Sequence, residues 1–297
     1  MTKQRTLGQF TVSAIGLGAM PVSMGRGDIP HDRALATIHA ALDAGITLID
    51  TADVYAPSWD TMGHNESVVA EALASWSGDR SSLVVATKGG ITREPGEVWA
   101  RNGSAGYLRA ACEASRDRLG VDQIDLYYWH RPDRSLRYAD CIETLGQLKA
   151  DGLVRQIGIS NANVEELQVA IEVLGEGQLA AVQNEFSPRF NHTSCDELRF
   201  CADHQITFVP WSPLGGTGGG AAAVGQRFPL IAEVAAAHQV SPQQVTLAWE
   251  LALGEHVLPI PGASRPESVR DCAQAMGLEL SVAEVEKLLA TPDREDP

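Results

Sequence analysis

The chain has 297 residues, of which 44% are hydrophobic and 21% are charged, a composition typical of globular proteins rather than disordered or disulfide-dense ones. Its 23 basic and 38 acidic residues give a formal net charge of −15. Because this charge repels phosphate backbones and anionic lipid headgroups, we expect no nucleic-acid partner and no membrane-surface partner.

Short apolar runs typical of β-strands recur along the chain. Their average spacing is roughly 35 residues, the length of one strand and one helix with their loops. The expected strands are AIGLG (14–18), TLID (47–50), LVVAT (83–87), IDLYYW (124–129), VRQIGI (154–159), AAVQ (180–183), ITFVP (206–210) and VLPI (257–260).

Several segments between these runs have helical periodicity. Apolar residues recur at helical spacing from Ala34 to Leu42 and from Val164 to Ile171. Asn163 precedes the second of these segments, and Ser241-Pro242 opens the stretch PQQVTLAWELAL. Both are residue types that favour helix N-termini.

Eight strands that alternate with helices predict a single (β/α)8 barrel, and no Pro-, Gly- or Ser-rich linker divides the chain. We therefore expect one domain over residues 1–297. The opening TLGQFTVSAIGLG predicts an N-terminal β-hairpin at the bottom of the barrel.

A doubly wound open sheet is the alternative. Against it, proline stands at the third glycine position of the only candidate dinucleotide turn, Gly16–Pro21.

The most glycine-dense segment is GGTGGG, residues 215–220. No Lys-Ser/Thr pair follows it, so it lacks the pattern of a Walker-type phosphate loop. We interpret it as either a flexible surface loop or a mobile flap over a ligand, because it follows a strand end.

Cysteine and histidine spacing gives no sign of a metal site. The five cysteines include no C-x-x-C pair, which disfavours a disulfide framework and indicates a reducing compartment. The eight histidines include neither H-x-H nor H-E-x-x-H, which disfavours a metal-dependent barrel hydrolase. With neither a signal-peptide core nor an 18-residue apolar run, we expect a cytoplasmic protein.

Polar residues follow most of the expected strands. In a (β/α)8 barrel, side chains at the carboxyl ends of the strands form the active site. The residues at these positions are Asp50, with Tyr55 five residues later, then Lys88, His130, Ser160, Asn161, Gln183, Trp211, Ser212 and the segment 260–265.

These positions lie within LIDTADVYAPSWDTMGHNES, VVATKGG, DLYYWHRPD, GLVRQIGISN, VQNEF, VPWSPLGG and PIPGASRPESV. In this order, the segments resemble motifs of the aldo-keto reductase superfamily, and the resemblance extends from Gly16 to Leu280. It implies a (β/α)8 barrel that binds extended NADP(H) without a Rossmann domain. It also implies reduction of an aldehyde or ketone, or the reverse oxidation of an alcohol.

Carbonyl reduction needs a hydride for the carbonyl carbon and a proton for its oxygen. A free tyrosine, with a pKa of about 10, is a poor acid–base group at neutral pH unless a nearby ammonium stabilises the phenolate. The resemblance implies Tyr55 as general acid/base and Lys88 as the ammonium that lowers its pKa. Asp50 would pair with Lys88 and hold it in place, and His130 would hydrogen-bond the carbonyl oxygen.

The resemblance also implies cofactor contacts by motif position. Ser160, Asn161 and Gln183 would bind the nicotinamide carboxamide, and Trp211 stands where the family has a ring-stacking aromatic residue. Ser212 and Leu214 would lie along the pyrophosphate.

At the adenosine end, the resemblance implies Arg265 and Ser264 as contacts of the 2′-phosphate and Asp271 as the acidic residue that faces adenine. Cys272 stands where the family often has asparagine. Because an arginine can pair with a phosphate dianion, we expect NADP(H), with NAD(H) as the alternative.

Four large side chains are predicted to line the substrate pocket: Met20, Trp59, Trp99 and Trp129. The loops 55–64 and 92–104 would contribute to it as well. An aromatic wall suits sugars or ring-shaped ketones, while pyridoxal and small aldehydes stay open. The alternative functions are an NAD(H)-linked alcohol or sugar dehydrogenase and a slow-turnover nicotinamide-binding regulatory subunit.

Overall fold

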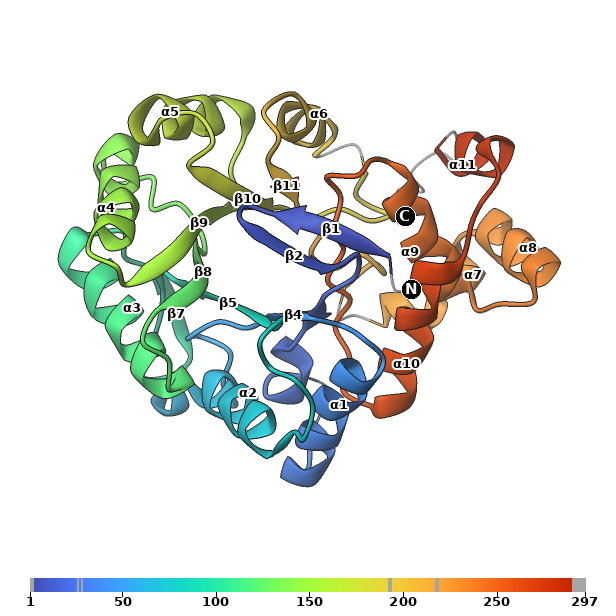
Figure 1. The fold of residues 1–297 in the computed structure, drawn as a ribbon, viewed down its shortest axis with the longest axis horizontal. Helices are drawn as coiled ribbons and strands as arrows, with labels where there is room; N and C mark the ends of the chain where they lie inside the picture. The colour runs from blue at the N-terminus through green and yellow to red at the C-terminus, as the bar shows by residue number, and fades with distance from the viewer. Residues whose placement is uncertain (1–2, 26, 28, 192–193, 217–218, 290–297) are drawn as a thin grey trace.

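A computed structural model describes residues 3–25, 27, 29–191, 194–216 and 219–289. Its central feature is a curled sheet of seven parallel strands, with helices around the outside (Figure 1). The neighbouring strands are, in order, β11 (Thr207–Phe208), β10 (Leu179–Gln183), β9 (Val154–Ser160), β8 (Ile124–Trp129), β5 (Val84–Gly89), β4 (Leu48–Asp50) and β3 (Leu17–Gly18).

The segment 257–262 closes this sheet into a barrel. Val257 forms a parallel bridge to Phe208 in β11, and Gly262 forms one to Gly18 in β3. The segment makes isolated bridges rather than the predicted eighth strand, because Pro259 and Pro261 have no N–H to donate. The (β/α)8 barrel itself is confirmed.

The helices form the outer layer and follow the strands in sequence. They are α1 (His31–Asp43), α2 (His64–Ser75), α3 (Ala105–Leu119), α4 (Tyr138–Ala150), α5 (Val164–Leu174), α6 (Cys195–Asp203), α7 (Gly220–Arg227), α8 (Pro229–His238), α9 (Pro242–Ala252), α10 (Pro266–Gln274) and α11 (Val282–Leu289). The short 3-10 helices among the described residues are η1 (Met20–Val22), η2 (Trp59–Thr61) and η3 (Ala275–Gly277).

Both predicted helix starts are confirmed. The Asn163 side chain accepts a hydrogen bond of 2.8 Å from the Glu166 N–H at the start of α5. The Ser241 hydroxyl accepts one of 3.1 Å from the Gln244 N–H at the start of α9. Each cap satisfies a backbone donor that has no partner inside its helix.

An N-terminal hairpin of β1 (Gln4–Leu7) and β2 (Phe10–Ser13) lies across one opening of the barrel (Figure 1). The Ser13 N–H donates to Thr47 Oγ1 over 2.8 Å, and Thr207 Oγ1 donates to the Thr6 carbonyl over 2.8 Å. Thr47 and Thr207 lie at the start of barrel strands, so the hairpin closes the bottom, as predicted. The opposite mouth, at the carboxyl ends of the strands, is left for the polar residues.

A second hairpin occupies the segment predicted as the loop 92–104. It pairs β6 (Ile91–Glu94) with β7 (Val98–Arg101) in antiparallel register. Gly96, with a φ of 81°, and Glu97, with a φ of 61°, make the turn. The prediction of a loop is therefore wrong. Every residue of β7 is exposed, and a strand with no buried face does not need the alternation of apolar and polar residues by which a strand is predicted from sequence.

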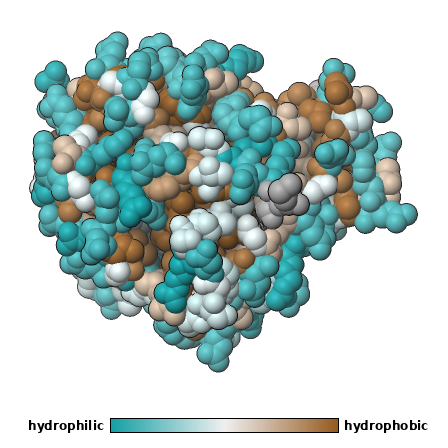
Figure 2. Space-filling view, viewed as in Figure 1, coloured by the Kyte–Doolittle hydropathy of each residue, from teal (hydrophilic) through white to brown (hydrophobic). Residues whose placement is uncertain are grey.

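Figure 2 shows the face of Figure 1 in space-filling form, with hydrophilic side chains over much of the outer helices and hydrophobic residues between them. Within the described ranges, no helix is long and apolar enough to cross a membrane. Among the same described residues, no three histidine, cysteine, aspartate or glutamate side chains are grouped so that they could hold a metal ion.

Candidate active site

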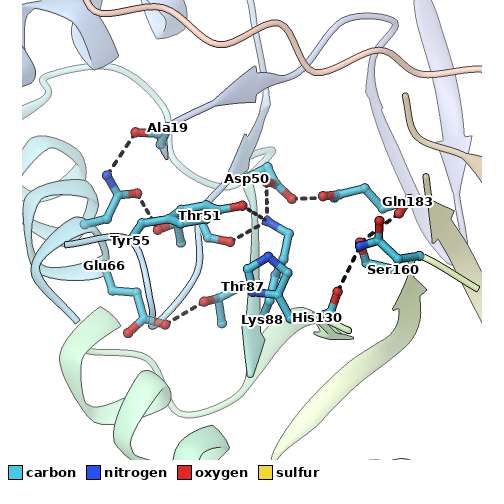
Figure 3. Close-up of polar contacts among 12 residues, drawn as sticks. Ala19, Asp50, Thr51, Tyr55, Glu66, Thr87, Lys88, His130, Ser160 and Gln183 are labelled. Carbon is cyan, nitrogen blue, oxygen red and sulfur yellow. Dashed lines mark hydrogen bonds and ion pairs between the residues drawn. The ribbon is translucent and has the colours of Figure 1, made fainter. Parts of the chain in front are cut away.

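Neighbouring strands bring four predicted residues together at the open mouth of the barrel. Asp50 ends β4, Lys88 lies near the end of β5, and His130 directly follows β8. Tyr55 lies on the loop after β4, and Figure 3 shows its side chain beside those of Lys88 and His130. Asp50, Tyr55, Lys88 and His130 are called the tetrad below.

Lys88 is the centre of the tetrad, and its side chain is 0% exposed. Its ammonium donates to an Asp50 carboxylate oxygen, to the Thr51 carbonyl over 2.7 Å and to Tyr55 Oη over 3.4 Å. Burial lowers the pKa of Lys88, but attraction to Asp50 and Tyr55 outweighs burial and raises it. The side chain is therefore a buried ammonium whose three N–H groups all have acceptors.

The pKa of Tyr55 lies above its ordinary value of 10.0, because burial disfavours the phenolate. Lys88 acts in the predicted downward direction, and its Nζ lies 5.0 Å from the centroid of the Tyr55 ring. Burial has the larger effect, so the net pKa of Tyr55 stays above its ordinary value although Lys88 lowers it. Tyr55 therefore holds its proton at neutral pH and is equipped to donate it.

Asp50 is held on both sides of its carboxylate. One oxygen pairs with Lys88, and the other accepts a hydrogen bond of 2.8 Å from Gln183 Nε2. Burial raises the pKa of Asp50, while Lys88 and Gln183 both lower it. The amide of Gln183 is thus directed at the tetrad from the end of β10 (Figure 3).

His130 is 8% exposed, and its ring centroid lies 5.6 Å from that of Tyr55 in an edge-on arrangement. Burial, followed by the charges of Lys88 and Arg131, lowers the pKa of His130 well below 6.5. Its Nδ1 is buried without a hydrogen-bond partner among the described residues. His130 is therefore a neutral imidazole beside the phenol, able to donate one hydrogen bond without adding a charge.

This burial predicts a pH-dependent stability. In the unfolded chain a histidine takes up a proton near pH 6.5, whereas folded His130 resists protonation. We expect the free energy of unfolding to fall as pH drops below about 6.5, by up to about 1.4 kcal/mol per pH unit from this residue. Urea unfolding of the protein and of His130→Asn at several pH values tests this. Equal pH slopes for the two proteins would contradict it.

The residues predicted to bind nicotinamide lie next to the tetrad. Ser160 Oγ donates to the Gln183 carbonyl over 2.8 Å. Asn161, with a φ of 62°, donates through Nδ2 to the His130 carbonyl over 3.1 Å and to Ser160 Oγ over 2.9 Å. The structure therefore brings these three residues together at the carboxyl ends of β9 and β10.

Trp211 follows β11 and is half-buried. Its Nε1 is buried without a hydrogen-bond partner in the described part of the chain. Ser212 has a φ of 54° and Leu214 is buried, so the backbone turns sharply directly after the indole.

The glycine-rich segment follows this turn, and Thr217 and Gly218 lie outside the described residues. A Cβ at Gly220, the first residue of α7, would lie 2.2 Å from the Gly215 carbonyl oxygen. Glycine is therefore required at position 220 for the chain to fold back on itself.

At the predicted adenosine end, Ser264 and Arg265 directly precede α10. Arg265 is exposed and donates to Ser268 Oγ over 3.2 Å, and it forms no ion pair with a described carboxylate. Asp271 instead accepts hydrogen bonds from Ser241 Oγ (2.7 Å) and Gln244 Nε2 (2.6 Å), which join α10 to α9.

Three of the predicted pocket residues lie near the mouth. Met20 follows Ala19, whose N–H donates to the Asp50 carbonyl over 2.8 Å. Trp59 is 38% exposed and Trp99 is 46% exposed. Their two segments are linked because the Glu97 carboxylate accepts a hydrogen bond of 3.0 Å from the Trp59 backbone N–H.

Trp129 does not line a pocket. Its side chain is 0% exposed and packs in the outer core, with its ring centroid 5.3 Å from that of Tyr138 in α4. Alternation along β8 is the reason: Tyr128 packs with the side chains inside the barrel, while Tyr127 and Trp129 pack among the helices.

Sequence reasoning missed two residues that hold the tetrad in place. Arg93 donates to the Ala56 carbonyl over 2.7 Å and pairs with Glu97, which fixes the segment that carries Tyr55. Asn65 is fully buried and accepts from Thr51 Oγ1 over 2.6 Å. Asn65 falls within one of the recognised motifs, whereas nothing in the unpredicted hairpin marks Arg93.

Known proteins are similar to this chain in both sequence and fold. The model of the aldo/keto reductase family matches residues 14–291. An uncharacterized oxidoreductase of Schizosaccharomyces pombe is 32% identical over 93% of this chain and 85% of its own length. The 6-dehydroglucose reductase of Novosphingobium aromaticivorans is 34% identical over 88% of each chain. A solved aldo/keto reductase of Klebsiella pneumoniae, in complex with NADP and acetate, has a TM-score of 0.79 and 29% identity, covering 100% of this chain and 98% of that one. The chain belongs to the aldo/keto reductase family.

Proposed function

We propose that the protein is an NADP(H)-dependent oxidoreductase that interconverts an aldehyde or ketone with the corresponding alcohol. The observation that carries this proposal is the fully buried Lys88 ammonium, which joins the Asp50 carboxylate to the Tyr55 phenol at the barrel mouth. A buried ion pair costs several kcal/mol of desolvation for each charge. An ion pair buried beside a protonated phenol and a neutral histidine is suited to proton transfer to a carbonyl oxygen.

The residues around the mouth fit a nicotinamide cofactor. Trp211 offers a flat ring and a buried N–H that lacks a partner in the described residues, beside Ser160, Asn161 and Gln183. Arg265 stands at the start of α10, where a helix N-terminus favours a phosphate. The relative from Klebsiella pneumoniae was solved with NADP. When bound, the cofactor supplies the hydride in reduction and accepts it in oxidation.

The tetrad handles the proton and the developing charge. In reduction, His130 donates a hydrogen bond to the substrate oxygen and orients it, a role whose loss typically costs about 10²–10³ in rate. Tyr55 Oη gives its proton to that oxygen, and the Lys88 ammonium stabilises the phenolate left behind. Asp50 keeps Lys88 in place. In oxidation, the phenolate takes the proton back.

One observation supports an NAD(H)-linked alcohol or sugar dehydrogenase as the second candidate. Arg265 is the only basic residue between positions 257 and 269, so a 2′-phosphate would have a single strong partner there. The relative from Novosphingobium aromaticivorans, named as a 6-dehydroglucose reductase, supports a sugar carbonyl as one substrate to include.

The test begins with tryptophan fluorescence titrations with NADPH and NADH, followed by multiple-turnover assays with aldehydes, ketones and oxidised sugars. We expect tighter binding of NADPH and repeated NADPH oxidation. Preference for NADH would favour the dehydrogenase. Binding followed by one slow turnover would favour a regulatory nicotinamide-binding protein, and binding of neither cofactor would contradict both enzymatic functions.

The Arg265→Ala variant tests the cofactor preference directly. A lost contact to a charged group is worth about 1.5–3 kcal/mol, so we expect the Kd for NADPH to rise roughly tenfold to a hundredfold while the Kd for NADH stays unchanged. Arg270→Ala, an exposed substitution in the same helix, is the matched control. Equal losses for the two cofactors would show that Arg265 does not bind the 2′-phosphate.

A further inference from the structure

Arg131 directly follows His130 at the mouth of the barrel. Its guanidinium carbon lies 6.0 Å from the centroid of the Trp211 ring. Its charge is the third cause, after burial and Lys88, that lowers the pKa of His130. Burial lowers the pKa of Arg131 itself, and an ionised Tyr55 would offset part of that lowering. The guanidinium therefore lies within electrostatic reach of both the phenol and the imidazole of the tetrad.

Arg131 differs from three other partly or fully buried arginines, each of which has a carboxylate partner. Arg5 pairs with Glu255, Arg93 pairs with Glu97, and Arg118 pairs with Glu66. Arg131 makes no hydrogen bond and no ion pair with any residue in the described ranges, although burial lowers its pKa. Desolvating a guanidinium without acceptors is unfavourable, so the position suits a ligand that brings its own acceptors.

The surroundings make this part of the mouth favourable for an anion. Arg101, at the end of β7, is a second cation close enough to lower the pKa of Arg131. Its Nη1 donates to the Pro132 carbonyl over 3.5 Å. The Glu185 carboxylate offsets part of this lowering, but it lies more than 4.0 Å from the guanidinium and forms no ion pair with it. Two neighbouring arginines thus flank the mouth of a chain whose net charge is −15.

We propose that Arg131 determines substrate specificity by binding a carboxylate on the carbonyl substrate, so that the preferred substrates are aldehydes or ketones that carry an acidic group. This inference rests on the function proposed above. A planar carboxylate can accept two parallel hydrogen bonds from one guanidinium, and its single negative charge matches one arginine. Because Arg131 adjoins His130 in the chain, a carboxylate held there would keep the carbonyl of the same molecule close to the tetrad.

The experiment uses two aldehydes that share the same ring and carbonyl group: 4-carboxybenzaldehyde, which is an anion at neutral pH, and its uncharged methyl ester. We expect the wild-type protein to have the higher kcat/KM for the carboxylate. In Arg131→Met, kcat/KM for the carboxylate should fall roughly tenfold to a hundredfold, the size expected for a lost charge-assisted contact, while that for the ester changes less than threefold. Arg131→Lys should keep part of the preference, because it retains the charge without the paired N–H groups.

Arg137→Met is the matched control. Arg137 lies in the same loop, but its side chain is 77% exposed and already pairs with Asp140, so this variant should match the wild-type protein. The Kd for NADPH, measured for every variant, confirms folding and separates substrate binding from cofactor binding. If Arg131→Met does not fold, the kcat/KM values of Arg131→Lys for the two aldehydes are compared with those of the wild-type protein instead.

Three results would overturn the inference. Equal losses for the two aldehydes would mean that Arg131 acts through Tyr55 or His130. A large rise in the Kd for NADPH would mean that Arg131 contacts the cofactor. No wild-type preference for the carboxylate would mean that Arg131 does not bind it. If the wild-type protein reduces neither aldehyde nor any other carbonyl compound, the proposed function fails and the inference fails with it.

Discussion

Replacing Tyr55 with phenylalanine is expected to lower the rate of carbonyl reduction by about three orders of magnitude, a typical loss for a general acid. The substitution removes only the hydroxyl group. The ring keeps its edge-on contact with His130 and its position 5.0 Å from Lys88 Nζ. The Kd for NADPH should therefore change little, because Tyr55 is proposed to act on the substrate oxygen and not to hold the cofactor.

The rate is measured in a single turnover with NADPH bound, and the Kd by fluorescence titration. Tyr107→Phe is the matched control, because its hydroxyl donates to the Ile91 carbonyl outside the tetrad. A Tyr55→Phe protein that reduces aldehydes at a rate near that of the Tyr107→Phe control would rule out Tyr55 as the proton donor.

Replacing Lys88 with methionine is expected to affect both stability and activity. The change leaves the Asp50 carboxylate buried beside Gln183 without its cation, and breaking a buried pair in this way costs about 3–5 kcal/mol. Turnover should fall by at least about 10²-fold as well, because no ammonium is left to stabilise the Tyr55 phenolate.

The stability loss should depend on pH in a defined direction. Without Lys88, the folded-state pKa of Asp50 rises further above its unfolded value of 3.8, because burial already raises it. The variant is then least destabilised at acidic pH, where Asp50 is protonated, and loses stability as pH rises through the folded-state pKa. Urea unfolding across this pH range measures the effect.

The double variant Lys88→Met with Asp50→Asn isolates the buried charge. It should recover part of the stability lost in Lys88→Met, but none of the activity. Lys149→Met, whose ammonium makes an exposed contact with Gln178, is the control for loss of a lysine. If Lys88→Met were as stable as that control at neutral pH, the pairing with Asp50 would not matter to the fold.

The barrel and the meeting of the tetrad residues can be predicted from the sequence because both follow from regular patterns. Apolar runs at regular spacing define the strands, and polar residues at the strand ends must meet at one mouth when parallel strands form a barrel. Asp50, Lys88 and His130 meet in this way. The hydroxyl at Ser241 and the amide at Asn163 likewise mark helix starts by local chemistry alone.

The features that could not be predicted depend on tertiary packing, which no local sequence pattern indicates. The segment at Pro259 supplies two isolated bridges instead of a strand, and the hairpin that carries Trp99 has one fully exposed strand. Trp129 follows the side-chain alternation of β8 and faces the helices. The raised pKa of Tyr55 reflects its burial, which is known only once the neighbouring strands are in place.

The central claim is that this chain transfers a hydride from NADPH to a carbonyl carbon, with Tyr55 supplying the proton. The most direct test is a single turnover with NADPH in which deuterium replaces both hydrogens at the reactive nicotinamide carbon. We expect the wild-type protein to place the deuterium on the alcohol carbon of the product, and Tyr55→Phe to bind the same cofactor without forming deuterated alcohol at a comparable rate. NADPH that binds tightly but is oxidised by no carbonyl compound would contradict the claim.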